Sequence, residues 1–91
     1  MSYTVYPTSR FKKELRSMQK RGYPIQKLQE VVELLRLGEK LPAKYRDHVL
    51  LGDFAGCREC HVAPDWLLIY EKEEDRLFLY LLRTGSHSDL F

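Results

Sequence analysis

The stretch that most constrains the fold of this chain is a bend at residues 61–66. Cys57–Val62 before the bend and Trp66–Lys72 after it have the composition of β-strands. Pro64-Asp65 is a turn signal, because proline presets the backbone angle and aspartate can bond its own main chain. The stretch therefore predicts a β-hairpin. Its bend gathers a histidine, a carboxylate and the chain's only tryptophan: His61, Asp65 and Trp66.

The first half of the chain predicts two helices that form an αα-hairpin. The first begins with Thr8 or Ser9 as its cap and ends at Gly22. The second runs from about Ile25 to Leu37, and Gly38 stops it. In each segment apolar residues recur at helical spacing: Phe11, Leu15 and Met18, then Ile25, Leu28, Val31, Val32 and Leu35. Each helix therefore keeps one face free to pack on a sheet.

Three further strands are predicted. Tyr3–Tyr6 is aromatic and β-branched, Val49–Leu51 follows a polar loop, and Arg76–Leu82 is a continuous apolar run typical of a central strand. The residues from Thr84 onward are expected to leave the sheet as a short tail. The element order is β-α-α-β-β-β-β. It predicts one domain over residues 1–91, an α+β fold with the helix pair packed on one face of a mainly antiparallel sheet of four or five strands.

Size and composition predict a globular protein of the cytoplasm. The chain has 91 residues, of which 44% are hydrophobic and 31% charged. No apolar run approaches the roughly 20 residues that span a bilayer, so no membrane partner is expected. Met1–Pro7 has neither the basic nor the apolar region of a signal peptide, and two cysteines without such a signal suggest reduced thiols.

Charge is unevenly distributed along the chain, although the net charge is only +2. Residues 1–46 hold 11 Lys and Arg against 4 Asp and Glu, whereas residues 47–91 hold 4 against 9. A basic half on a nearly neutral protein suggests a polyanionic partner for one face. Helix surfaces are also often rich in Lys and Arg for solubility alone, so charge by itself leaves nucleic acid as one of two interpretations.

Cys57–His61 spells the C-x-x-C-H pattern of covalent haem attachment, and context argues against it. Cys57 and Cys60 lie three residues apart on a predicted strand, so their side chains point to opposite faces. The same geometry argues against structural zinc, for which the chain offers no second C-x-x-C pair. The three histidines with Asp65 could form a metal site if the fold gathered them. We nevertheless expect no metal and no other cofactor, with one cysteine buried and the other partly exposed.

The residues that could carry chemistry lie in loops or at strand ends, where functional groups concentrate: His48, His61, Asp65, Arg83 and His87. Metal-independent RNA cleavage uses the 2′-OH as nucleophile. It needs a base, an acid for the leaving 5′-oxygen and cations for the charged phosphorane. Histidine can serve as base or acid near neutral pH, and arginine binds phosphate through two N–H groups. The bend at residues 61–66 and the segment from Arg83 to His87 lie close together only if the last strand pairs beside the Trp66 strand.

Each of these residues also has a plain structural interpretation. A histidine at a strand end is more often a satisfied polar residue than a catalyst. Trp66 opens an apolar strand, so it could belong to the core instead of stacking on an RNA base. Phe91 is the last residue and either docks in the core or serves a site. The residues alone therefore indicate a small basic α+β domain with RNA-binding or nuclease function as one interpretation.

Three segments resemble a known family. Tyr45–Leu50, Cys60–Tyr70 and Arg83–Phe91 are similar, in order and spacing, to motifs of the RelE/ParE toxin superfamily, and within it to the YafQ-like mRNA interferases. The resemblance extends over the full length, including the helix pair. It implies a RelE-like fold and a bacterial toxin of a type II toxin–antitoxin pair that cuts mRNA on the ribosome and so inhibits translation.

The resemblance also implies roles for single residues. His48, His61, Asp65 and His87 match the catalytic acid–base set, with His87 the foremost proton-transfer residue, and Arg83 matches the phosphate-stabilising cation. Phe91 matches the aromatic that orients substrate, and Trp66 matches a site-adjacent aromatic. Glu59 is a further acidic candidate on the strand before the bend. The basic helices would meet ribosomal RNA.

Other points stay open at the level of sequence. The implied partners are a cognate antitoxin and mRNA on the ribosome. Assembly with the antitoxin as a heterotetramer, the face that the antitoxin covers, the codon preference and the division of acid and base among the histidines are left undecided. Two alternative functions remain: a ParE-like binding toxin that inhibits DNA gyrase, against which the three histidines count, and a non-catalytic RNA-binding domain.

Overall fold

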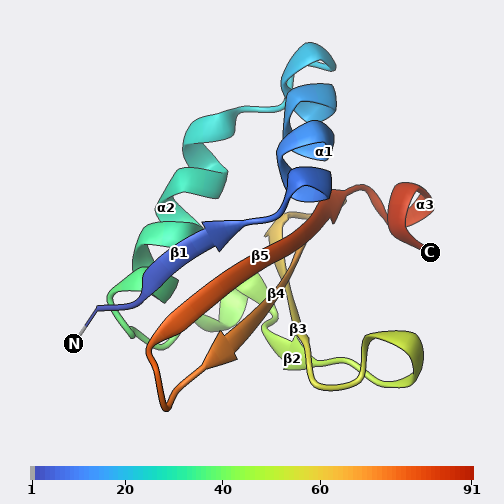
Figure 1. Ribbon diagram of the computed structural model, residues 1–91. Coiled ribbons are helices and arrows are strands. Elements are labelled where there is room, and N and C mark those ends of the chain that lie inside the picture. The colour runs from blue at the N-terminus through green and yellow to red at the C-terminus, as the bar shows by residue number, and fades with distance from the viewer. Residues whose placement is uncertain (1) are drawn as a thin grey trace.

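A computed structural model describes residues 2–91 and shows a helix pair on a five-stranded sheet (Figure 1). The strands are β1 (Thr4–Pro7), β2 (His48–Val49), β3 (Arg58–Ala63), β4 (Trp66–Glu73) and β5 (Phe78–Gly85). They lie in the order β1-β5-β4-β3-β2; β1 runs parallel to β5, and the other neighbours are antiparallel. The predicted α+β fold and its strand count are confirmed.

The two long helices begin and end where local chemistry requires. In α1 (Ser9–Lys20) the Thr8 hydroxyl caps the helix by accepting a hydrogen bond from the Phe11 amide. Between α1 and α2 (Ile25–Arg36) lies Gly22, and after α2 lies Gly38. Both glycines have positive φ, which suits glycine because it lacks a Cβ.

The helix pair covers one face of the sheet, and its apolar stripes form the main core with that face. Phe11, Met18, Leu28, Val31 and Leu35 are buried against strand residues that include Cys60, Trp66 and Leu68. A smaller cluster on the other face joins Leu67 and Ile69 to Leu90. Cys57 belongs to the smaller cluster and Cys60 to the main core, so the two thiols face opposite ways, as the strand geometry predicts.

The last strand lies further along the chain than predicted. It spans Phe78–Gly85 instead of Arg76–Leu82, because the β4–β5 turn includes residues 74–77 and Leu77 has φ of 58°. Thr84 and Gly85 therefore stay in the sheet, paired with Leu68 and Leu67. The prediction that they leave it was wrong.

Three local details were also missed. The residues after β5 form a short helix, α3 (His87–Leu90), where a tail was expected. Edge strand β2 is shorter and earlier than the predicted Val49–Leu51. The polar loop before β2 contains a 3₁₀ turn, η1 (Ala43–Tyr45). Among the described residues, no helix is long and apolar enough to cross a membrane.

Candidate active site

The bend of the β3–β4 hairpin and the end of β5 lie at the same end of the sheet. β5 pairs with β4 up to Gly85, whose partner is Leu67, one residue after the bend. His87, two residues beyond Gly85, is thereby brought to Asp65. The convergence expected between residues 61–66 and the C-terminal segment is present.

His87 and Asp65 form the closest contact of the site. The His87 ring Nδ1 lies 2.6 Å from Asp65 Oδ1, and the His87 backbone N–H donates to the same oxygen at 3.1 Å. These hydrogen bonds from His87 hold the pKa of Asp65 below its ordinary value. Asp65 therefore stays ionised into the acidic range and fixes the orientation of the imidazole.

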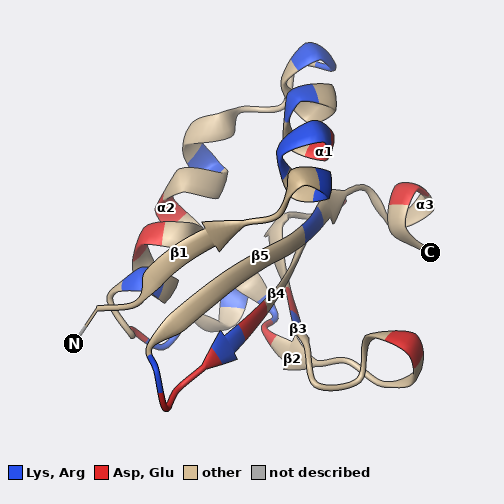
Figure 2. Ribbon diagram, viewed as in Figure 1, with Lys and Arg blue, Asp and Glu red and all other residues tan. Residues whose placement is uncertain are grey.

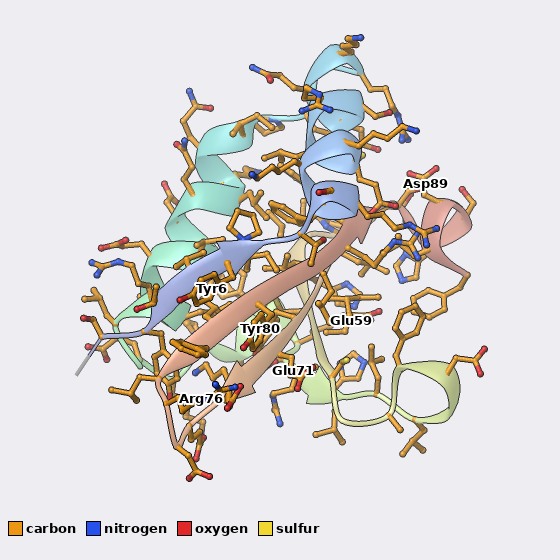
Figure 3. The ribbon with its side chains drawn as sticks, in the orientation of Figure 1. Tyr6, Glu59, Glu71, Arg76, Tyr80 and Asp89 are labelled. Atoms are coloured by element: carbon orange, nitrogen blue, oxygen red, sulfur yellow. The ribbon has the colours of Figure 1, made fainter. Side chains whose placement is uncertain are left out.

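Helix α3 holds His87 in this position. Its N-cap residue Ser86 accepts from the Asp89 amide, and the Asp89 carboxylate accepts from the Ser86 amide in return, which is a capping box. Asp89, which Figure 3 labels on α3, also accepts from Arg21 Nη1 at 2.8 Å, and Arg21 is the residue that follows α1. Arg21 and the Ser86 contacts lower the pKa of Asp89 to about 2.

The three histidines form a row. The ring centroids of His87 and His61 are 5.5 Å apart, and those of His61 and His48 are 6.5 Å apart. His48 donates from Nδ1 to the Arg46 carbonyl at 2.7 Å. The residues come from α3, β3 and β2, which only the fold brings together.

Glu59 lies beneath the row. It is 5% exposed, and its Oε1 is 3.4 Å from His48 Nε2 and 4.0 Å from His61 Nε2. Its Oε2 is buried and has no partner among the described residues. A buried carboxylate is costly without partners, and the two imidazoles lie within ion-pair distance of its other oxygen, Oε1. The structure thus makes Glu59, a weaker candidate in the sequence, an integral part of the arrangement.

Arg83 is held by a residue that the sequence interpretation did not single out. Within the described chain its side-chain hydrogen bonds go to Glu14 on α1, at 2.8–2.9 Å through Nε and Nη2. Glu14 Oε1 also accepts from the Thr84 amide, so it occupies the edge of β5 beyond the end of β1. In the sequence, Glu14 could have been noticed because it is the sole carboxylate of a basic helix. The phosphate-binding role of Arg83 stays a prediction.

Trp66 does not face the site, and its predicted contact with substrate is wrong. Its side chain is fully buried in the main core, where the indole N–H donates to the Thr84 hydroxyl at 2.9 Å. That hydroxyl donates to the Leu67 carbonyl at 2.8 Å. A side chain with no exposed surface cannot stack on a base, so Trp66 is structural.

Phe91 is exposed and does not dock in the core. Its side chain is 65% exposed and lies edge-to-face with Phe54, with ring centroids 6.0 Å apart. The sequence left Phe91 either docked in the core or serving a site. Its exposed position next to α3 agrees with the second interpretation. An exposed aromatic ring can stack on an unpaired base.

The histidine row and its two carboxylates contain the groups that acid–base chemistry needs. Three imidazoles, an oriented carboxylate and a buried carboxylate lie within one edge of the sheet. No group of three or more His, Cys, Asp or Glu among residues 2–91 is arranged to hold a metal ion. Imidazole and carboxylate side chains of this kind can accept and donate protons.

Comparison with known proteins identifies the family. The sequence profile of the YafQ bacterial toxins of type II toxin–antitoxin systems matches residues 3–91. The chain belongs to this family. It is 42% identical over 85 residues to the mRNA interferase toxin YafQ of Escherichia coli strain K12, covering 92% of this chain and 90% of the relative. The prediction of a YafQ-like toxin is confirmed, and the predicted mRNA-cleaving enzyme agrees with the name of this relative.

Solved structures of related toxins have the same fold. The E. coli DinJ–YafQ toxin–antitoxin complex contains a chain with a TM-score of 0.90 and 36% identity, with 100% of this chain and 99% of that chain covered. A metal-bound toxin from Helicobacter pylori gives a TM-score of 0.90 and 38% identity over 100% of both chains. The RelE-like fold of this YafQ-family toxin is thus well established.

Proposed function

We propose that this toxin is a ribosome-dependent mRNA endoribonuclease of the cytoplasm that inhibits translation. The observation that carries the proposal is the row of His48, His61 and His87 with Asp65 and Glu59 at one edge of the sheet. These residues come from separate elements, and a site of this composition suits the cleavage of RNA without metal.

The proposed reaction is an attack of the RNA 2′-oxygen on the adjacent phosphorus. One residue of the row takes the 2′-OH proton and a second gives a proton to the leaving 5′-oxygen. The P–O5′ bond breaks as the P–O2′ bond forms, which leaves a 2′,3′-cyclic phosphate and a 5′-OH. His87 is the foremost proton-transfer residue because Asp65 orients it. Arg83 would stabilise the charged phosphorane, and Phe91 would stack on a substrate base.

The charge distribution supports an RNA-rich partner. Figure 2 shows Lys and Arg gathered along α1, and most of these side chains are exposed. The phosphates of ribosomal RNA would favour this face through counterion release. We propose in addition that a cognate antitoxin binds the chain, as DinJ binds the E. coli toxin, with a heterotetramer as the assembly to be tested.

The test is cleavage of mRNA on translating ribosomes, with mapping of 5′ ends and analysis of the end groups. Replacing His87 by alanine should lower the rate by roughly 100- to 10,000-fold, the range of general acid–base catalysis. Ser88→Ala, at the next position of α3, is the matched control and should cleave like wild type. Unchanged cleavage by His87→Ala would refute the assignment of His87.

Two outcomes would favour the alternative functions. Intact mRNA together with inhibited DNA gyrase would indicate a ParE-like binding toxin. RNA binding that no histidine substitution alters, without cleavage, would indicate a non-catalytic RNA-binding domain.

A further inference from the structure

A cavity of about 390 Å³ lies beside the histidine row. It is formed by α2, by η1 with the residue that follows it, and by the segment 61–64 at the end of β3. Its volume is within the range of roughly 300–1,000 Å³ that is usual for sites of small ligands. His61 lines this cavity and also stands in the row, so the cavity adjoins the row.

The cavity carries excess positive charge. Lys27, Lys44 and Arg46 line it against one carboxylate, Glu30. None of the three cations forms an ion pair within residues 2–91. Every described lysine shares this property, and among the arginines only Arg46 and Arg16 do. Unpaired cations around a cavity favour an anionic ligand.

The cavity also offers an aromatic surface. Tyr45 is half-buried and packs against the main core, and Lys44 Nζ lies 5.0 Å from the ring centroid. An aromatic ring next to a cation suits a nucleotide, because the ring can contact a base while the ammonium binds a phosphate.

Arg46 couples the cavity to the row. Its backbone has φ of 49° and ψ of 44°, a left-handed conformation that is costly for a residue with a side chain. Its carbonyl accepts the hydrogen bond from His48 Nδ1, while its side chain lines the cavity. One residue thus orients a histidine of the row and bounds the adjoining cavity.

We propose that this cavity binds a nucleotide next to the scissile phosphate of a single-stranded RNA. This inference rests on the proposed function, because the proposed nuclease reaction is what places the scissile bond at the histidine row. The flanking phosphate is bound by Lys44, Arg46 and Lys27, and the base lies against Tyr45. An RNA strand that fills the cavity passes His61 on its way to His87.

Binding is tested apart from cleavage. The probe is a trinucleotide of 2′-O-methyl RNA, which lacks the nucleophilic hydroxyl, added to the full-length isotope-labelled protein. Amide resonances of residues 44–46 and 61–64 should shift in a saturable way, with smaller shifts in α1. Absence of shifts at these residues up to millimolar trinucleotide would overturn the inference, whether or not mRNA is cleaved on ribosomes.

Charge variants separate this site from the row. Lys44→Gln and Arg46→Gln should each weaken trinucleotide binding and lower the salt slope of log K by about 0.7, the value for one lost contact to single-stranded phosphate. In cleavage they should raise KM more than they lower kcat. Lys40→Gln, an exposed lysine outside the cavity, is the control.

The results of this inference and of the proposed function can be told apart. If Lys44→Gln and Arg46→Gln bind and cleave like Lys40→Gln, the nucleotide site is refuted and the nuclease proposal stands. If the trinucleotide binds at residues 44–46 and 61–64 and no cleavage occurs on ribosomes, the nucleotide site stands and the nuclease proposal fails.

Discussion

The Thr84 hydroxyl is a single group on which the buried end of the sheet depends, and its removal gives a quantitative test. Thr84 is 1% exposed and Trp66 has no exposed surface. The hydroxyl accepts from the indole N–H at 2.9 Å and donates to the Leu67 carbonyl at 2.8 Å. Thr84→Val keeps the shape of the side chain and removes both hydrogen bonds.

The cost follows from the burial of both partners. A buried N–H left without an acceptor costs about 1–3 kcal/mol, and the lost bond to Leu67 adds about 1 kcal/mol. Burial of the new methyl group offsets about 0.8 kcal/mol. The free energy of unfolding should therefore fall by about 2 kcal/mol.

Urea denaturation measures the effect. With a slope of about 1.3 kcal/mol per molar urea, near the lower end for small proteins, the midpoint should fall by roughly 1.5 M. The melting temperature should fall by roughly 8–16 °C. Thr4→Val, an exposed threonine in β1, is the matched control and should stay within about 0.5 kcal/mol of wild type.

Two results would refute the reasoning. A midpoint for Thr84→Val that equals the control would show that the indole N–H finds another acceptor. Lost RNA cleavage with unchanged stability would show that this end of β5 acts on substrate directly. The expected result is lower stability with near wild-type cleavage at temperatures where both proteins are folded, which would also support the structural role of Trp66.

Four further predictions concern α3. Asp89→Asn should lower the midpoint of urea unfolding, and its double-mutant cycle with Arg21→Gln should show a favourable coupling; additivity would contradict the pairing. Because the folded-state pKa of Asp89, about 2, lies below the unfolded value, this stabilisation should be complete above about pH 4 and be lost as the pH falls toward 2, a dependence that Asp89→Asn should lack. Gly85→Ala places a Cβ 2.9 Å from Asp89 Cβ and should displace α3, so cleavage should fall and the His87 amide resonance should move; wild-type values of both would refute the close packing. The His87 amide, bonded to Asp65, should titrate in NMR with a midpoint below the ordinary aspartate pKa, and Asp65→Asn should abolish that titration; a midpoint at or above the ordinary value would contradict the contact.

Local patterns predicted most elements of this fold because their causes are local. The apolar spacing of the helices, the Thr8 cap and the Pro64-Asp65 turn each act within a few residues. The end of β5 was misplaced for the opposite reason. Thr84 and Gly85 look like a loop in sequence, and they stay in the sheet because β4 supplies their pairing partners.

The site was predictable as a set of residues and not as an arrangement. The motif segments predicted His48, His61, Asp65 and His87, and the structure brings them to one edge, where their catalytic roles stay predictions. The burial of Trp66 could not be read from its position beside the bend.

The sequence alone determined the fold class, the hairpin, the helix pair and the family. Tertiary structure alone decided two of the ion pairs: Arg83 binds Glu14, 69 residues away, and Asp89 binds Arg21, 68 residues away. The physical reason is that secondary structure follows from interactions between near neighbours, whereas an ion pair between distant segments depends on how the helices and the sheet pack. The same packing creates the cationic cavity beside His61, which no motif in the sequence predicted.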